Sequence, residues 1–308
     1  MRADWKLAVT IAVAATVLAA GAYETLRPAP RPSASPRLVP VVAAENFWGS
    51  LVAQIGGEHV RVLSLITDPN ADPHEIESTA QGARAIADAR LVVINGAGYD
   101  DWAAQLLSAN AGSTQVTLNV AELLGVAAGV NPHFWYNPDD VRTAARAMHD
   151  DLVALDPVDA AYFEQQFVAL STRLSSLDGE IGAIRHAFAG AAVASTESIF
   201  VYLANATALD LVSPPEFMDA VAEGTDPSAA SVATFEQQLS SGGVGLLVYN
   251  LQTQTTLTEQ MTQIATDHHV ALVGITETVE PADATYETWM GAELSDLESA
   301  LASSSAGG

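Results

Sequence analysis

The sequence of 308 residues has no cysteine, and Lys6 is the single lysine among 12 basic residues. The absence of cysteine excludes disulfide frameworks, thiol nucleophiles, cysteine-ligated zinc and a lipid-carrying cysteine near the N-terminus. Any bound metal must therefore be held by His, Asp or Glu. With 12 basic and 37 acidic residues the formal net charge is −25, so the chain lacks the basic surface with which nucleic-acid-binding proteins displace counterions from phosphates.

The N-terminus has the pattern of an export signal. Arg2 and Lys6 precede an uncharged apolar run of 16 residues, 7–22, which matches the charged and hydrophobic regions of a signal peptide. The run is shorter than the roughly 20 residues that span a bilayer, so cleavage and permanent anchoring both stay open. We expect residues 1–26 to be a signal peptide or membrane anchor and residues 27–37 a proline-rich linker. The folded part is then extracytoplasmic, in the periplasm or on the outer face of the cell membrane.

From Leu38 onward, short β-branched runs alternate with longer helical stretches, which predicts an α/β fold with parallel sheets and crossover helices. The alternation occurs twice. We therefore expect an N-terminal α/β lobe over 38–155, a C-terminal α/β lobe over 191–302 and a disordered tail over 303–308. The strands are expected at residues 39–43, 60–66, 91–94, 115–118, 191–194, 209–212, 244–249 and 270–275, and helices at 48–55, 80–89, 101–108, 138–155 and 292–302.

The segment 156–190 predicts one long helix that joins the two lobes. Its apolar residues recur at spacings of four and three, which places them on one face of a helix. Asp156 and Pro157 suit the first two positions of such a helix, which would be about 50 Å long. Gly179 costs about 1 kcal/mol relative to alanine, so a kink there is one alternative and a two-stranded coiled coil is another. The apolar stripe comprises Phe163, Phe167, Leu170, Leu174, Leu177, Ile181, Ile184 and Phe188.

Two of the seven histidines, His74 and His133, end near-identical tripeptides, Asp-Pro-His and Asn-Pro-His. In each tripeptide the proline fixes its own φ and restricts the preceding residue, so the imidazole lies on a stiffened loop. Each loop follows a predicted parallel strand, and preorganised loops suit metal ligands. We expect the other five histidines at the surface.

Two acidic residues occupy equivalent places in the second half, because Glu197 follows the strand at 191–194 and Glu277 follows the strand at 270–275. Ligands of open parallel sheets bind outside the carboxyl ends of the strands. Two imidazoles and two carboxylates there would neutralise a divalent cation. Each residue alone also has a structural explanation, as an acid near a helix N-terminus, an exposed loop acid or a hydrogen-bonded histidine.

Several segments, in this order and spacing, resemble the solute-binding components of zinc/manganese ABC importers. They are Asn-Ala-Asp-Pro-His-Glu at 70–75, Val-Val-Ile-Asn-Gly-Ala-Gly-Tyr-Asp at 92–100, Asn-Pro-His-Phe-Trp at 131–135, Ser-Thr-Glu-Ser-Ile-Phe at 195–200 and Thr-Glu at 276–277. The resemblance covers residues 39–301. It implies two parallel-sheet α/β lobes joined by one long rigid helix, the helical-backbone type of metal receptor.

The resemblance also implies ligands and partners. By motif, the metal ligands would be His74, His133, Glu197 and Glu277. The chain would be a monomer without catalytic activity that delivers its ion, Mn²⁺ or Zn²⁺, to an ABC permease and its ATPase. The sequence departs from the family at Glu277, where aspartate is more frequent, and in having no lipid-carrying cysteine.

The identity of the metal and two other functions stay open at this stage. A carboxylate-rich ligand set favours hard ions such as Mn²⁺, although Zn²⁺ binds most such sites more tightly, and we favour manganese. One alternative is an exported metallohydrolase, because His74-Glu75 resembles half of a zinc-protease motif. However, Ser78 stands where the second histidine would be, and four protein ligands would leave no position for a catalytic water. The other alternative is a surface adhesin with a vestigial metal site.

Overall fold

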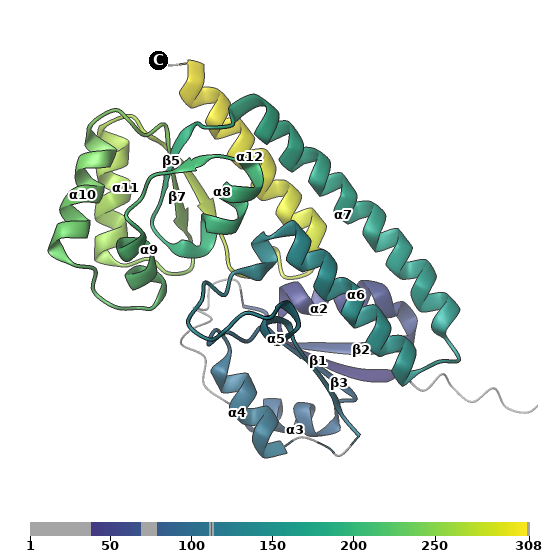
Figure 1. Cartoon of the computed structure of the whole chain (residues 1–308). Helices are drawn as coiled ribbons and strands as arrows, with labels where there is room; N and C mark the ends of the chain where they lie inside the picture. The colour runs from purple at the N-terminus through teal and green to yellow at the C-terminus, as the bar shows by residue number, and fades with distance from the viewer. Residues whose placement is uncertain (1–37, 69–78, 111, 113, 307–308) are drawn as a thin grey trace, which may run out of the picture. The chain divides into compact units, whose positions relative to one another are not determined.

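The computed structural model describes residues 38–306, apart from 69–78, 111 and 113. The predicted export segment and linker at 1–37 therefore lie outside the described residues, as does His74. The described part forms two four-stranded parallel sheets with helices packed against them (Figure 1). No helix within this part has both the length and the apolar composition needed to cross a bilayer.

The first sheet has the strand order β2-β1-β3-β4. Its inner strand β3 is buried along its whole length, as expected for a parallel strand that is covered on both faces. Val41 of β1 is in register with Val62 on one side and Leu91 on the other. The strands are β1 (Val39–Glu45), β2 (Val60–Ile66), β3 (Leu91–Ile94) and β4 (Val116–Asn119), and the accompanying helices are α2 (Asn46–Gly56), η1 (Gly57–His59), α3 (Ala80–Asp88), α4 (Asp101–Asn110), α5 (Val120–Leu124), η3 (Phe134–Tyr136) and α6 (Pro138–Leu155).

The second sheet has the order β6-β5-β7-β8, which repeats the topology of the first. The prediction of two parallel-sheet α/β lobes is thereby confirmed, and all eight strands lie within two residues of their predicted ranges. The strands are β5 (Ala192–Ser195), β6 (Asp210–Leu211), β7 (Leu246–Asn250) and β8 (Ala271–Ile275), and the helices of this half are η4 (Ser198–Phe200), α8 (Val201–Thr207), α9 (Pro215–Ala222), α10 (Ala229–Ser240), α11 (Thr256–Asp267) and α12 (Tyr286–Ala306).

The long helix predicted between the lobes is α7 (Ala160–Phe188), which runs through Gly179 without a break. Its apolar stripe is buried from Phe163 to Ile184 and packs against α2, α6 and α12 of the same chain, so the stripe is not a coiled-coil seam. The predicted start at Pro157 is wrong. Asp156 begins a turn instead, in which its carbonyl accepts a hydrogen bond from the N–H of Asp159 at 3.2 Å, and the helix follows that turn.

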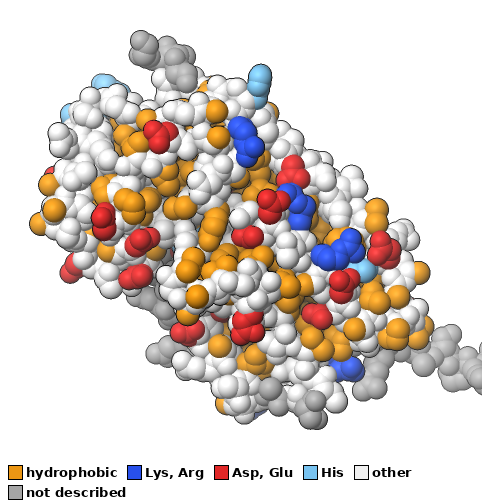
Figure 2. Space-filling model, viewed as in Figure 1, with side chains coloured by type: hydrophobic (Ala, Val, Ile, Leu, Met, Phe, Trp, Pro, Cys, Tyr) orange, Lys and Arg blue, Asp and Glu red, His pale blue; other side chains and the backbone are white. Residues whose placement is uncertain are grey.

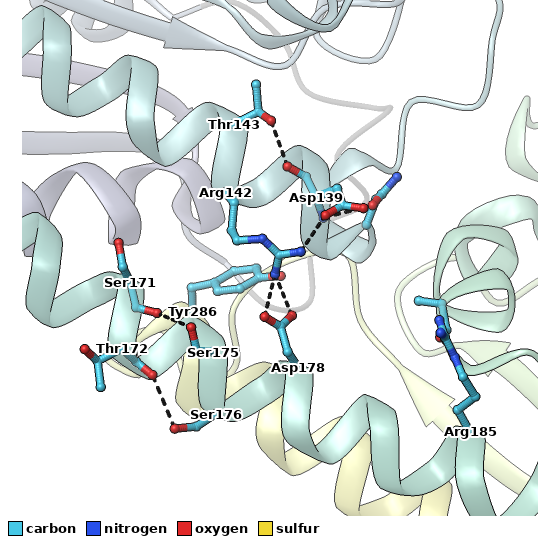
Figure 3. A network of polar contacts seen from close by, with 12 residues as sticks. Asp139, Arg142, Thr143, Ser171, Thr172, Ser175, Ser176, Asp178, Arg185 and Tyr286 are labelled. Atoms are coloured by element: carbon cyan, nitrogen blue, oxygen red, sulfur yellow. Dashed lines mark hydrogen bonds and ion pairs between the residues drawn. The ribbon is translucent and has the colours of Figure 1, made fainter.

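Ion pairs fasten α6 to α7 (Figure 3). The guanidinium of Arg142 on α6 donates to both carboxylate oxygens of Asp178 on α7, at 2.5 and 2.7 Å, and to Asp139 at 2.5 Å. On the polar side of α7 the Ser175 hydroxyl donates to the carbonyl of Ser171, one turn earlier, at 2.8 Å. Of these contacts, the one between Arg142 and Asp178 joins the two helices.

The last helix, α12, is longer than predicted at both ends. It begins at Tyr286 because Thr285 caps it, with its hydroxyl oxygen accepting from the N–H of Thr288 at 3.3 Å. Residues 303–306 are helical, and the prediction of disorder there is wrong. The hydroxyls of Ser303 and Ser304 donate to carbonyls of the preceding turn, at 2.8 and 2.9 Å.

The two halves share one hydrophobic core. The largest cluster of buried apolar side chains includes residues of β1, α2 and α6 from the first half and of β5, β8 and α12 from the second, with α7 contributing to both. Asn46 adds a two-point polar link, since its amide donates to the carbonyl of Val279 at 3.0 Å and accepts from the Val279 N–H at 2.9 Å. Strand ends of both halves are thereby fixed relative to each other.

Candidate metal centre

Glu197 lies in the turn that follows β5 and is fully buried. Its backbone is extended, and the hydroxyl of Ser195 closes the turn by donating to the Glu197 carbonyl at 2.8 Å. Ser213 in turn holds Ser195, accepting from its N–H at 2.8 Å. The Glu197 carboxylate is therefore placed by backbone contacts at the carboxyl end of the sheet, as predicted.

Glu277 is also fully buried and follows β8. The side-chain carbonyl of Gln252, in the loop after β7, accepts from the N–H groups of Glu277 and Thr278 at 2.5 and 3.1 Å. The loop after one strand thus fixes the backbone of the residue after the neighbouring strand.

The carboxylates of Glu197 and Glu277 lie close together, because both accept hydrogen bonds from the side chain of Asn250 at the end of β7. The Asn250 amide nitrogen donates to Glu197 Oε2 at 3.1 Å and to Glu277 Oε1 at 2.6 Å. The remaining oxygen of each carboxylate accepts from a hydroxyl group. Thr253 donates to Glu197 Oε1, and Tyr99 of the first half donates to Glu277 Oε2 at 2.7 Å.

His133 is fully buried in the loop before η3. Its Nδ1 lies 2.6 Å from the side-chain carbonyl oxygen of Asn131, which accepts hydrogen bonds, so the neutral ring carries its proton on Nδ1 and its lone pair on Nε2. The Asn131 amide also donates to the carbonyl of Ser198, next to Glu197, at 2.7 Å. The Tyr99 ring lies 6.2 Å from the His133 ring between centroids, and its hydroxyl is hydrogen-bonded to Glu277 of the second half.

Glu197 and Glu277 are thus buried at strand ends and His133 is buried in the loop before η3, and the three side chains are connected through Asn250, Tyr99 and Asn131. The fourth, His74, lies outside the described residues. Within the described part alone, no group of three or more His, Asp or Glu side chains is arranged to hold a metal ion. His133, Glu197 and Glu277 therefore do not form a metal site by themselves.

Sequence reasoning missed the residues that support these side chains. Asn250 directly follows the predicted strand at 244–249, so its place at the carboxyl end of a parallel strand is the same signal that points to Glu197 and Glu277. Tyr99 had a weaker signal, its place within the segment 92–100. Trp135 stacks on Phe47 with 4.1 Å between ring centroids and lies 5.1 Å from the His133 ring, so aromatic rings surround the imidazole.

One further histidine differs from its prediction. His149 on α6 is buried, although we expected it at the surface. Its ring packs on Phe167 with 5.0 Å between centroids, and its nitrogens lie 2.8 Å from Asp150 and 3.1 Å from Glu164. Packing against the apolar stripe of α7 accounts for its burial.

A second pair of acids, Glu45 and Asp100, is buried near Tyr99. Burial raises the pKa of Glu45 well above 4.5, and the charge of Asp100 raises it further. Burial also raises the pKa of Asp100, although its carboxylate accepts from the N–H groups of Asn95 and Gly96 at 2.6 and 2.7 Å. These bonds close the turn that carries Tyr99, whose own pKa is raised by burial and by the charge of Glu277, so its hydroxyl remains a donor.

Glu293 on α12 supports the segment before Glu277. Its carboxylate accepts from the Thr276 N–H at 2.9 Å and lies 2.7 Å from the Tyr136 hydroxyl, which also lies 2.7 Å from the Thr276 carbonyl. A hydroxyl has one proton and cannot donate to both. A protonated Glu293 resolves the conflict by donating to Tyr136, which then donates to Thr276. Burial raises the pKa of Glu293 to about 7.

We expect Glu293→Gln to flatten the dependence of stability on pH. A carboxyl with a pKa of 4.5 unfolded and about 7 folded stabilises the fold fully below pH 4.5, and this contribution is lost as the pH rises through 7. The wild type should lose roughly 2 kcal/mol from this group between pH 5 and 7.5. The variant, whose amide donates like the protonated acid, should not. Urea unfolding of both proteins across this range measures the difference, and parallel curves would contradict the assignment.

The chain thus consists of two parallel α/β lobes with one repeated topology, joined by a long helix. A family model described as "Zinc-uptake complex component A periplasmic" (ZnuA) matches residues 41–300, and the chain belongs to this family. In three dimensions the chain is similar to the "periplasmic zinc binding protein TroA from Treponema pallidum", with a TM-score of 0.73, 17% identity, and coverage of 85% of this chain and 98% of that one. This likeness confirms the fold.

The curated relatives match shorter stretches of the chain. A "Putative metal-binding protein" of Treponema pallidum is 24% identical over 184 residues, which are 54% of this chain and 58% of the relative. The "Manganese-binding lipoprotein MntA" of Halalkalibacterium halodurans is 26% identical over 141 residues, 45% of this chain and 47% of the relative. The chain thus spans about half the length of the curated relatives it matches.

Proposed function

We propose that the chain is the extracytoplasmic solute-binding component of an ABC importer. It captures a divalent transition metal ion, Mn²⁺ or Zn²⁺, and delivers the ion to a membrane permease that is driven by an ATPase. The observation that carries the proposal is the meeting of two fully buried carboxylates, Glu197 and Glu277, on the amide of Asn250. Two carboxylates that lie together can neutralise a divalent cation, and carboxylate oxygens are common ligands of such ions in proteins.

The ligand set that we propose is His74, His133, Glu197 and Glu277. The tautomer of His133 supports it, because a metal-binding imidazole commonly donates its other ring N–H to an oxygen, as Nδ1 does to Asn131. Nitrogen and oxygen ligands fit both ions. Among the relatives, the Halalkalibacterium protein is named for manganese and the Treponema structure for zinc.

The surface charge supports cation capture as well. The chain carries a net charge of −25, and acidic side chains are spread over the face shown in Figure 2, where basic ones are fewer. A field of this sign raises the local concentration of cations. In this proposal the protein acts as a monomer, has no catalytic activity, and is exported or anchored by residues 7–22.

Calorimetry on metal-stripped protein tests the proposal. We expect one Mn²⁺ or Zn²⁺ to bind per chain, and a protein that binds neither ion would overturn the proposal. A strain without the gene should grow poorly under metal limitation and recover with added metal, whereas loss of an adhesin gives no such defect. The comparisons lend no support to an adhesin or a metallohydrolase.

A further inference from the structure

The four oxygens of Glu197 and Glu277 have hydrogen-bond donors of two kinds. Asn250 supplies amide protons to one oxygen of each carboxylate, at 3.1 and 2.6 Å. The other two oxygens accept from the hydroxyls of Thr253 and Tyr99. Both carboxylates are thus bonded at once to a fixed amide and to a rotatable hydroxyl.

The amide of Asn250 has a defined orientation. Its carbonyl oxygen accepts from the N–H of Gln252 at 2.9 Å, and the residue is buried at the end of β7. Rotation of the amide would break this bond and turn the carbonyl oxygen toward two carboxylates. The nitrogen therefore stays directed at Glu197 and Glu277.

The hydroxyl donors are held less firmly. A hydroxyl turns its proton away by rotation about its C–O bond without moving the side chain. Tyr99 reaches Glu277 Oε2 from the first half of the chain, and the Tyr99 ring lies 6.2 Å from the His133 ring between centroids. An ion that binds Glu277 through Oε2 must replace or share this hydrogen bond.

We propose that Asn250 is the positioning residue for metal capture, a role that rests on the proposed function. Its two amide protons hold Glu197 and Glu277 side by side before the ion arrives, so binding does not have to overcome their repulsion. In the metal-loaded protein, Asn250 stays hydrogen-bonded to one oxygen of each carboxylate. The ion binds the other two oxygens, which accept hydrogen bonds from Thr253 and Tyr99 in the metal-free protein. Each glutamate then binds through one oxygen.

The proposal predicts opposite effects for the two kinds of donor. Asn250→Leu, which removes the amide at nearly constant volume, should weaken Co²⁺ and Mn²⁺ binding 10- to 100-fold, the range typical of residues that orient metal ligands. Tyr99→Phe removes a competitor of the ion and should strengthen binding several-fold. The matched control is Gln238→Leu, which removes an amide that donates to the Val212 carbonyl at 2.6 Å in the same half of the chain.

Titration with Co²⁺, followed by visible absorption, separates positioning from a loss of folding. Asn250→Leu frees both carboxylates to bind through two oxygens, so its Co²⁺ complex should absorb more weakly as the coordination number rises. Gln238→Leu should keep the wild-type spectrum and affinity. If Asn250→Leu does not fold, the direction in which Tyr99→Phe changes the metal affinity still tests the proposal.

The outcomes distinguish this inference from the proposed function. If the wild type binds none of the three ions Co²⁺, Mn²⁺ and Zn²⁺, the proposed function is wrong. If the wild type binds and Asn250→Leu matches it in affinity and spectrum, or if Tyr99→Phe binds more weakly, the role of Asn250 is wrong.

Discussion

The His133→Ala variant is expected to lose at least about 100-fold in affinity for Mn²⁺ and Zn²⁺, more than the loss typical of a residue that only supports a ligand. The imidazole is fully buried and its Nδ1 is bonded to Asn131, so the deletion removes a preoriented nitrogen donor that the remaining ligands cannot supply. Competition with a chromophoric chelator measures the change. Circular dichroism of the metal-free variant shows whether the fold is retained.

His149→Ala is the matched control for this prediction. Both histidines are buried and both pack on an aromatic ring, Trp135 for His133 and Phe167 for His149. Truncation of His149 opens a similar cavity on α6 without touching the proposed ligands. It should lower the melting temperature and leave metal affinity within about 2-fold, since distant sites act independently. Equal losses of affinity in the two variants would show that general destabilisation, not ligation, is measured.

The sequence predicted the sheets well because parallel strands covered on both faces are short apolar runs between polar turns. For the same reason it located Glu197 and Glu277, which follow such runs directly. Helix ends were harder to predict. Asp156 followed by Pro157 suits a helix start, yet these residues form a turn and α7 begins at Ala160, because cap and turn signals use the same residue types.

The contacts that complete the centre could not be predicted. Tyr99 and Glu277 are 178 positions apart, and their bond depends on how the two halves pack. The link between Asn46 and Val279 spans 233 positions and has the same origin. Periodicity and local motifs report which side chains are buried, but pairing between distant loops follows from the shared core, which includes α7.

The second large effect concerns that core. Leu170→Ala should lower the free energy of unfolding by roughly 2–5 kcal/mol. Leu170 lies at the middle of the α7 stripe and is fully buried in the cluster that includes residues of both halves. Its truncation leaves a cavity that a rigid helix, fastened to α6 by Arg142 and Asp178, cannot close by shifting.

Val168→Ala, two residues earlier on the same helix, is the control. Val168 is 53% exposed whereas Leu170 is 0% exposed, so the same helix is altered without loss of buried contacts. Alanine also has the higher helix propensity, and the change should be neutral within about 0.5 kcal/mol. Urea unfolding, followed by tryptophan fluorescence and by circular dichroism, measures both variants. If α7 is the common support of the two halves, the two probes should give one coincident transition in Leu170→Ala, shifted to lower urea. Separate transitions would show that the halves unfold independently and that the stripe does not join them.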